Sequence, residues 1–434
     1  MCARRPRVLF VYADRVAQDL GGTGIRALEL ARALSDSAEV SIAATESDGS
    51  DLGVPVATFA PHAPRQLAGL AKSADMIVAQ PQWPLAMRAL ERSGAQLVFD
   101  LYDPELFGTI EHFSARPRRL RRTMVALAND RLNRALRLAD RVICGGERQR
   151  DLWIGTMLAV GRIDRDAYAR DPSYRSVIDT VPFGLPEEPP QRGAAPGPRE
   201  LFGLAPDEPL ALWNGGIWSW LDAETAIRAF AEWRGRNGAG TLVFMGASPS
   251  PAAKSAEARA RHLAGELGLL GESVLFSETW VPYGERATWL LEADCAIYAH
   301  HERLEARYAH RTRLLDCFWA GLPIVCTTGD ELAEEVDRRD LGATAPAGDH
   351  LALADALTRV FDRGRPGFGP ALAEAASERT WARAVAPLVR WAGEPPPPRA
   401  GTLAAPPGER ARTSAYLAAA AGAAALRLPA PRLP

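Results

Sequence analysis

The sequence predicts an α/β protein with two Rossmann-like domains that face each other across a cleft. Short β-rich apolar runs alternate with amphipathic helical patterns, which is typical of parallel sheets covered by helices on both faces. The alternation stops in a stretch rich in proline and glycine and then starts again. With 434 residues, the chain is also longer than one hydrophobic core usually serves.

The predicted elements follow from local patterns in both halves. In the first half, β-rich runs occupy 7–13, 40–44, 75–80, 96–102 and 140–146, and a helical pattern occupies 25–35. In the second half, β-rich runs occupy 209–214, 241–247, 273–280, 295–301 and 323–326, and helical patterns occupy 223–233, 256–269 and 310–320.

The break in the alternation is PFGLPEEPPQRGAAPGPRE, at residues 182–200. This stretch is the expected linker between a first domain at 1–181 and a second domain at 201–391. The remaining residues, 392–434, form an Ala/Pro-rich tail, in which 414–428 is compatible with a helix or with disorder.

Composition excludes several classes of protein. A formal charge of -2 and 47% hydrophobic residues are typical of a soluble globular protein and give no support to nucleic-acid binding. No apolar run reaches the length of about 18 residues that crosses a bilayer, so we expect a cytoplasmic protein without a transmembrane segment. RPRRLRRTM, at 116–124, is a candidate for contact with an anionic membrane, but a solvated arginine face is the favoured interpretation. The oligomeric state stays open.

Cysteine and histidine spacing argues against disulfides and metal sites. The five cysteines are scattered and include no CxxC pair, so we expect reduced, buried thiols. His300, His301 and His310 do not have the spacing of a standard ligand pair, and we expect no metal.

Two glycine turns follow predicted strands at corresponding places in the two halves. Gly21 and Gly22 come before the first helix, and Gly215 and Gly216 follow the first strand of the second half. Free backbone N–H groups at such junctions favour anions, and glycine lets a phosphate or sugar approach the backbone. A tight turn without a ligand is the alternative. The repetition favours a ligand site between the two halves.

The stretch HRTRLLDCFWAGLPIVC places Arg311 and Arg313 at the start of a predicted helix. Positive charge is unfavourable there unless it meets an anion, and guanidinium groups match phosphate oxygens bidentately. Asp316 lies three residues after Arg313, on the same face, where it can accept hydrogen bonds from a ribose diol. The alternative for the arginines is a surface ion pair with Glu302 or Glu305.

Carboxylates and an aromatic residue gather after a strand of the first half, in VFDLYDPELFGTIEH. Asp100, Tyr102, Asp103 and Glu105 suit recognition of a polyhydroxylated or aminated acceptor by hydrogen bonding. Asp103 with the following proline is also an ordinary turn signal.

These motifs together resemble the GT-B glycosyltransferases of family 4, the group 1 type, over most of residues 7–391. The resemblance rests on GGTGIRALELARAL, DRVICGGERQR, VPFGLP, WNGGIWSWLDAETAIRAF, WVPYGERATWLLEADCAIYAHH and HRTRLLDCFWAGLPIVC. It implies a nucleoside-diphosphate sugar donor and retention at the anomeric carbon, and we expect no metal or other cofactor. The acceptor stays open: a polysaccharide precursor, a secondary metabolite, an amino sugar or a thiol. UDP, GDP and TDP are all compatible with the donor.

The resemblance also implies roles for individual residues. Asp316 would bind ribose, the backbone at Trp280 and Val281 would lie beside the base, and Gly216 with both arginines would hold the diphosphate. Glu147 would lie on the acceptor side.

The sequence departs from the family's pattern at several places. The loop positions that usually carry an arginine and a lysine are Gly216 and Leu221, so Arg311 and Arg313 are the expected substitutes. The first of two paired acids falls on Tyr308, and Glu305 or Glu302 is the expected replacement. A histidine before the acceptor-side Asp103 is replaced by Tyr102.

Three other functions stay open. A nucleotide-sugar 2-epimerase would use the same donor site without an acceptor, and a non-catalytic binding protein would keep the fold and lose turnover. A nicotinamide oxidoreductase is the least favoured, because no glycine fingerprint is followed by an acid on the second strand.

Overall fold

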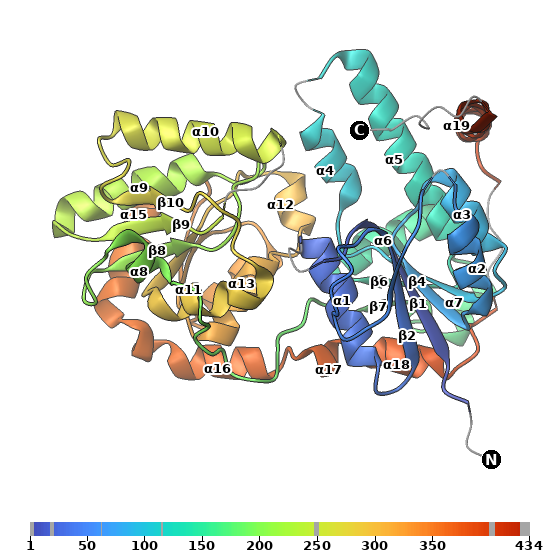
Figure 1. The fold of residues 1–434 in the computed structure, drawn as a ribbon, viewed down its shortest axis with the longest axis horizontal. Helices are drawn as coiled ribbons and strands as arrows, with labels where there is room; N and C mark the ends of the chain where they lie inside the picture. Colours follow the sequence, from blue (N-terminus) through green and yellow to red (C-terminus); the bar gives the residue numbers. More distant parts are fainter. Residues whose placement is uncertain are drawn as a thin grey trace. The chain divides into compact units, whose positions relative to one another are not determined.

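The structure is a computed structural model that describes residues 4–17, 21–61, 63–113, 116–246, 251–398 and 404–425. The chain divides into two compact units (Figure 1): unit 1 contains residues 1–182 and 384–434, and unit 2 contains residues 183–383. Each unit is built on its own parallel sheet, which confirms the predicted pair of Rossmann-like α/β domains.

Unit 1 contains a seven-stranded sheet in the order β3-β2-β1-β4-β5-β6-β7. Its elements are β1 (Arg7–Arg15), α1 (Gly22–Leu34), β2 (Glu39–Glu46), β3 (Val56–Thr58), α2 (Arg65–Ser73), β4 (Met76–Ala79), α3 (Pro84–Glu91), β5 (Gln96–Asp100), α4 (Glu105–His112), α5 (Arg118–Leu138), β6 (Arg141–Cys144), α6 (Glu147–Ala159), α7 (Arg165–Arg170) and β7 (Ile178–Thr180). The chain order reverses between β1 and β4, and ligands of such sheets bind at the carboxyl ends of the strands beside that point.

Unit 2 contains a six-stranded sheet in the order β10-β9-β8-β11-β12-β13. Its elements are α8 (Pro198–Phe202), β8 (Leu210–Trp213), α9 (Ala223–Asn237), β9 (Thr241–Phe244), α10 (Pro251–Glu266), β10 (Val274–Phe276), η1 (Tyr283–Glu285), α11 (Arg286–Glu292), β11 (Cys295–Tyr298), α12 (Leu304–Tyr308), α13 (Thr312–Ala320), β12 (Ile324–Thr327), α14 (Glu331–Arg338), β13 (Gly342–Ala345), α15 (His350–Arg363), η2 (Arg365–Gly367), α16 (Gly369–Ser377) and α17 (Trp381–Ala384). In Figure 1, α9, α10 and α15 lie on one face of this sheet, and α11 and α13 lie on the other. The chain order reverses between β8 and β11.

The boundaries of the two units differ from the expected ones. Unit 2 ends at 383, not at 391, because α18 (Ala386–Ala392) packs on unit 1. The guanidinium of Arg141 lies 5.0 Å from the ring centroid of Trp391, and Arg390 forms an ion pair of 3.3 Å with Asp179. The expected linker 182–200 belongs almost entirely to unit 2, where Leu185 forms a β-bridge with Thr380.

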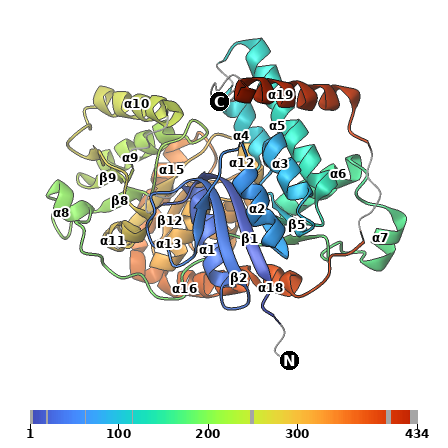
Figure 2. The same cartoon turned by 45° about the vertical axis from the view of Figure 1, so that its right-hand side comes forward.

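The tail forms a helix, α19 (Pro407–Ala425), that lies beside α3 and α5 of unit 1 (Figure 2). Arg412 donates two hydrogen bonds of 2.5 and 2.6 Å to the carboxylate of Asp130 on α5. The ring of Tyr416 stacks on Trp83 with 6.1 Å between centroids. Among the described residues the helical alternative for 414–428 is therefore correct, and residues 426–428 lie outside them.

Two further expectations from the sequence concern the cysteines and membrane-spanning helices. The four described cysteines, Cys144, Cys295, Cys317 and Cys326, are buried free thiols. No helix in the described ranges is long and apolar enough to cross a bilayer.

Candidate functional site

The glycine turn of unit 2 lies at the carboxyl end of β8. Gly215 has a φ of +127°, a conformation that side chains disfavour. Arg313 of α13 lies across this turn, because its Nη1 donates to the carbonyl oxygen of Gly216 at 2.6 Å. A Cβ on Gly215 would lie 2.9 Å from Cζ of Arg313. Asn214 fixes the backbone of Arg313, because its Nδ2 donates to the Arg313 carbonyl oxygen at 2.9 Å. The turn and Arg313 therefore form one cationic assembly.

Asp316 follows Arg313 by three residues on α13. Its Oδ1 accepts a hydrogen bond of 2.9 Å from Nε of Arg286. The side chain of Asp316 is 24% exposed, and no described residue donates to its Oδ2. One carboxylate oxygen of Asp316 is therefore available to a ligand.

Trp280 and Val281 lie in the loop after β10, at the same edge of the sheet. Gly246 connects this loop to the glycine turn. A Cβ on Gly246 would lie 3.4 Å from the amide nitrogen of Gly216 and 3.6 Å from Cε3 of Trp280. Unit 2 thus brings together most of the residues expected at the donor.

Arg311 and Glu305 form a buried network, which differs from the expected diphosphate clamp. Nη2 of Arg311 lies 3.3 Å from Glu305 and its Nε lies 3.9 Å from Asp330. Nε2 of His300 lies 2.7 Å from the same Asp330 carboxylate. Burial opposes ionisation of Asp330, but the hydrogen bond from His300 and the charge of Arg311 hold its pKa below the usual value. The side chain of Arg311 is 4% exposed, so it pairs with buried carboxylates inside unit 2. The predicted alternative, a pair with Glu305, is the arrangement found, buried instead of on the surface.

Asp100 of unit 1 is enclosed at the end of β5. Its carboxylate accepts hydrogen bonds from Nε and Nη2 of Arg26 at 2.7 and 3.1 Å, from the hydroxyl of Tyr12 at 2.6 Å and from the amide of Tyr102 at 3.2 Å. Burial and the charge of Asp100 raise the pKa of Tyr12, which keeps this hydroxyl a donor. The side chains of Asp100 and Arg26 are both 0% exposed. Asp100 also lines a hollow of unit 1, but its carboxylate is already engaged by these internal hydrogen bonds, which disfavours the expected role of Asp100 in binding an acceptor.

A hollow of 170 Å³ opens at the carboxyl edge of the unit 1 sheet. Asp103 and Glu105, both expected there, line it together with Arg131 of α5 and Trp153 of α6. Glu105 forms an ion pair with Arg131, and burial lowers the pKa of the Arg131 guanidinium to about 10. Trp153 fixes the loop by donating from Nε1 to the carbonyl oxygen of Leu101 at 2.9 Å.

The remaining predicted residues of unit 1 fall into two places. Gly21 is the N-cap of α1, and a Cβ on Gly22 would lie 3.5 Å from the hydroxyl of Tyr102. These glycines belong to unit 1, whereas the other residues expected at the donor belong to unit 2. Glu147 begins α6, where it accepts a hydrogen bond of 2.6 Å from Arg175 in an exposed ion pair.

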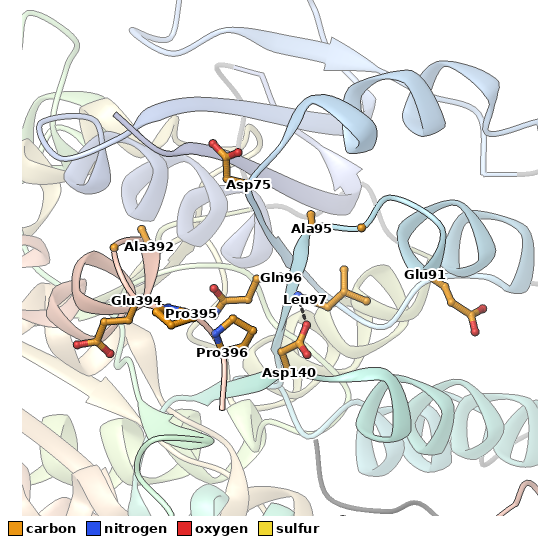
Figure 3. A pocket seen from close by; sticks show the side chains of 12 residues that line it. Asp75, Glu91, Ala95, Gln96, Leu97, Asp140, Ala392, Glu394, Pro395 and Pro396 are labelled. Atoms are coloured by element: carbon orange, nitrogen blue, oxygen red, sulfur yellow. Dashed lines mark hydrogen bonds between the residues drawn. The ribbon is translucent and has the colours of Figure 1, made fainter. Parts of the chain in front are cut away.

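A larger hollow of 530 Å³ lies at the opposite, amino edge of the unit 1 sheet (Figure 3). Asp75, Asp140 and Glu394 line it. Asp140 accepts a hydrogen bond of 2.8 Å from the amide of Leu97. Ligands of doubly wound sheets bind at the carboxyl edge, so this hollow carries no functional argument. In the described part of the chain, no group of three or more His, Cys, Asp or Glu residues could hold a metal ion.

Several residues of these sites were not predicted from the sequence. They are Arg286, Asn214, His300 and Asp330 in unit 2, and Tyr12, Arg26 and Arg131 in unit 1. An arginine inside an apolar helix face, as at Arg26 in GTGIRALEL, indicates a buried partner, but the sequence does not name that partner.

Comparison with solved structures places this architecture among known proteins. HepE from Anabaena, in complex with UDP-glucose, matches with a TM-score of 0.66 and 16% identity over 89% of this chain and 100% of that chain. The chain has the GT-B fold. Sucrose-phosphate synthase from Thermosynechococcus elongatus matches with a TM-score of 0.60 and 17% identity over 89% and 98% of the two chains. WaaG, a glycosyltransferase involved in lipopolysaccharide biosynthesis, matches with a TM-score of 0.61 and 14% identity over 89% and 100%.

No protein-family model matches the sequence, and no curated protein matches it. The likeness therefore shows the GT-B fold, and the chemistry depends on the residues of the two units.

Proposed function

We propose that this GT-B protein is a glycosyltransferase that moves a sugar from a nucleoside-diphosphate sugar, bound by unit 2, to an acceptor bound by unit 1. One observation carries the proposal: Arg313 lies across the Gly215–Gly216 turn, and Asp316 presents an open oxygen one helical turn further on. The complex of HepE with UDP-glucose supports this donor class.

Each part of the donor would meet a group suited to it. The diphosphate would bind between Gly216 and Arg313, and the ribose diol would donate to Oδ2 of Asp316. The base would lie beside the backbone at Trp280 and Val281. When the sugar leaves, negative charge develops on the diphosphate, and the guanidinium of Arg313 would stabilise that charge because it is already in place.

The acceptor would bind in the hollow of unit 1. Asp103, with Glu105 and Arg131 beside it, offers hydrogen-bond acceptors and donors to hydroxyl or amino groups. This suits a small or medium acceptor, such as a polysaccharide precursor, an aminated sugar, a secondary metabolite or a thiol. Asp103 is the residue that we assign to contact the reacting acceptor group.

Retention at the anomeric carbon rests on the family resemblance, and independence of metal ions rests on the arginine and backbone amides that would stabilise the leaving diphosphate. We expect activity to persist in excess EDTA, and we expect the product to keep the anomeric configuration of the donor when the linkage is read by proton NMR. Loss of activity in EDTA, with recovery on adding Mg²⁺, would contradict the first expectation. An inverted product would contradict the second.

A thermal-shift titration with UDP, GDP, dTDP, ADP and NAD, one at a time, tests the proposal. A ligand that binds only the folded state raises its apparent stability. Selective stabilisation by one of UDP, GDP or dTDP supports the donor site and names the nucleotide. Stabilisation by NAD alone, or by none of them, would contradict it. Product analysis with donor alone separates transfer from epimerisation, because an epimerase converts the sugar without an acceptor.

A further inference from the structure

Arg286 is the residue that fixes Asp316. It begins α11, directly after η1 and close to Trp280 and Val281 in the chain. Its Nη1 donates to the carbonyl oxygen of Tyr283 at 2.6 Å, and its Nε donates to Oδ1 of Asp316 at 2.9 Å. One guanidinium therefore joins the loop expected beside the base to the carboxylate expected at the ribose.

Two aromatic rings hold this guanidinium in place. Its Cζ lies 3.5 Å from the ring centroid of Tyr283 and 4.7 Å from that of Trp319, which follows Asp316 on α13. Trp319 is fixed in turn, because its Nε1 donates to the carbonyl oxygen of Glu188 at 2.8 Å. The side chain of Arg286 is 9% exposed. A planar guanidinium stacked on aromatic rings loses little further freedom when it forms a hydrogen bond.

The contact with Arg286 makes the two carboxylate oxygens of Asp316 different from each other. Arg286 uses Oδ1, which fixes the rotation of the carboxylate about its Cβ–Cγ bond. Oδ2 then has a defined direction and stays open. An aspartate on an exposed helix face would otherwise sample several rotamers, and a ligand would have to select one of them.

We propose that Arg286 is a positioning residue that orients Asp316 so that Oδ2 accepts the hydrogen bonds of the ribose diol. This inference rests on the proposed function of unit 2 as a nucleotide-sugar site. Arg286 acts through Asp316 and makes no contact with the sugar itself. The contribution that Arg286 makes through Asp316 is therefore limited to ligands that carry the diol.

The experiment compares two ligands and two variants by isothermal titration calorimetry. The ligands are UDP and 2′,3′-dideoxy-UDP, or the corresponding pair for whichever nucleotide stabilises the wild-type protein. The variants are Arg286→Gln and, as a matched control, Arg261→Gln. Arg261 also stacks on a ring in unit 2, 4.4 Å from the centroid of Phe276, and pairs with Glu257 and Glu278.

We expect Arg286→Gln to lower the affinity for UDP about tenfold, which corresponds to one lost hydrogen bond. The affinity for dideoxy-UDP should change less than about twofold. Arg261→Gln should change neither ligand. Equal weakening of both ligands by Arg286→Gln, or no weakening of UDP, would overturn the inference.

Arg286→Lys serves as the second variant, because it keeps the positive charge and loses the rigid fork. The affinity of this variant for UDP should lie between those of the wild type and Arg286→Gln, and its affinity for dideoxy-UDP should be unchanged. If Arg286→Gln does not fold, Arg286→Lys decides: an unchanged ratio of the two affinities would overturn the inference. Failure of the wild type to bind any nucleoside diphosphate is a different result and would contradict the proposed function instead.

Discussion

Each unit contains an aspartate paired with an arginine at the carboxyl edge of its sheet, and the two pairs differ in how much of the carboxylate is used. In unit 1, both oxygens of Asp100 accept hydrogen bonds, and the side chains of Asp100 and Arg26 are fully buried. In unit 2, Arg286 takes one oxygen of Asp316, and the carboxylate remains 24% exposed. The same two residue types therefore give a structural pair in unit 1 and a ligand-ready carboxylate in unit 2.

The difference shows why residue type and position in the chain are not enough to assign a site. Asp100 and Asp316 both occur where ligands of doubly wound sheets bind. What separates them is whether hydrogen-bonding capacity remains after the fold has formed. The following changes test that distinction, from the largest expected effect to the smallest.

Breaking the buried pair should mainly affect stability. Arg26→Met leaves Asp100 buried without its counter-charge, and removing one partner of such a pair costs about 3–5 kcal/mol. We expect the urea unfolding transition of unit 1 to shift by a free energy of that size. Arg286→Met, the control in unit 2, leaves a partly exposed carboxylate and should cost much less. Similar losses for the two variants would remove the distinction between the pairs.

Removing the cation at the glycine turn should mainly affect binding of the diphosphate. A hydrogen bond to a charged group contributes about 1.5–3 kcal/mol, so Arg313→Ala should weaken a nucleoside diphosphate roughly 10- to 150-fold. Binding of the nucleoside should change little. Calorimetric titration of both ligands measures the ratio, and an equal loss for both would exclude Arg313 from the diphosphate.

A methyl group at the turn should displace Arg313 without removing it. The Cβ of Gly215→Ala would lie 2.9 Å from Cζ of Arg313. We expect a smaller loss of diphosphate affinity than for Arg313→Ala. Gly238→Ala is the matched control, since Gly238 also has positive φ but no atom lies within 4 Å of its Cβ position. Equal affinities for the two glycine variants would show that Arg313 need not lie across the turn.

A third carboxylate, Asp330, should make the stability of unit 2 depend on pH only in acid. Its folded-state pKa is lowered from the ordinary value of 3.8, so ionised Asp330 stabilises unit 2 at any pH above that value. The contribution is lost as the pH falls through the folded pKa. The stability gap between wild type and Asp330→Asn should stay constant from about pH 5 to 8 and narrow below about pH 4. Urea unfolding across this range measures the gap, and one that narrows near neutral pH would contradict the assignment.

Most of the fold could be predicted from the sequence because the central strands are strongly apolar. The runs at 7–13 and 295–301 gave β1 and β11. The missing strands, β3, β7 and β13, have the sequences VAT, IDT and GATA, and each contains at most one large apolar residue, so no apolar run marks them. The predicted end of unit 2, at 391, lies beyond the observed end at 383, because α18 has the pattern of any amphipathic helix and only packing shows which unit it covers.

The site was predictable in part for a related reason. Gly215, Gly216, Arg313 and Asp316 lie in stretches where charge or glycine interrupts an apolar pattern, and these interruptions are visible in the sequence. Arg311 also interrupts an apolar pattern, but it is buried. The sequence does not show this, because its partners Glu305 and Asp330 come from separate elements. Arg286 belongs to a helix start that looks ordinary until α13 is placed beside it.

Hydrogen–deuterium exchange with and without the nucleoside diphosphate that stabilises the protein tests the central claim most directly. Three segments of unit 2 should gain protection: 213–217, which contains the glycine turn, 280–286, which contains the loop expected beside the base, and 313–319, which contains Arg313 and Asp316. Peptides of unit 1 that contain Asp100 should not change. Protection around Asp100, with none at the glycine turn of unit 2, would contradict the account.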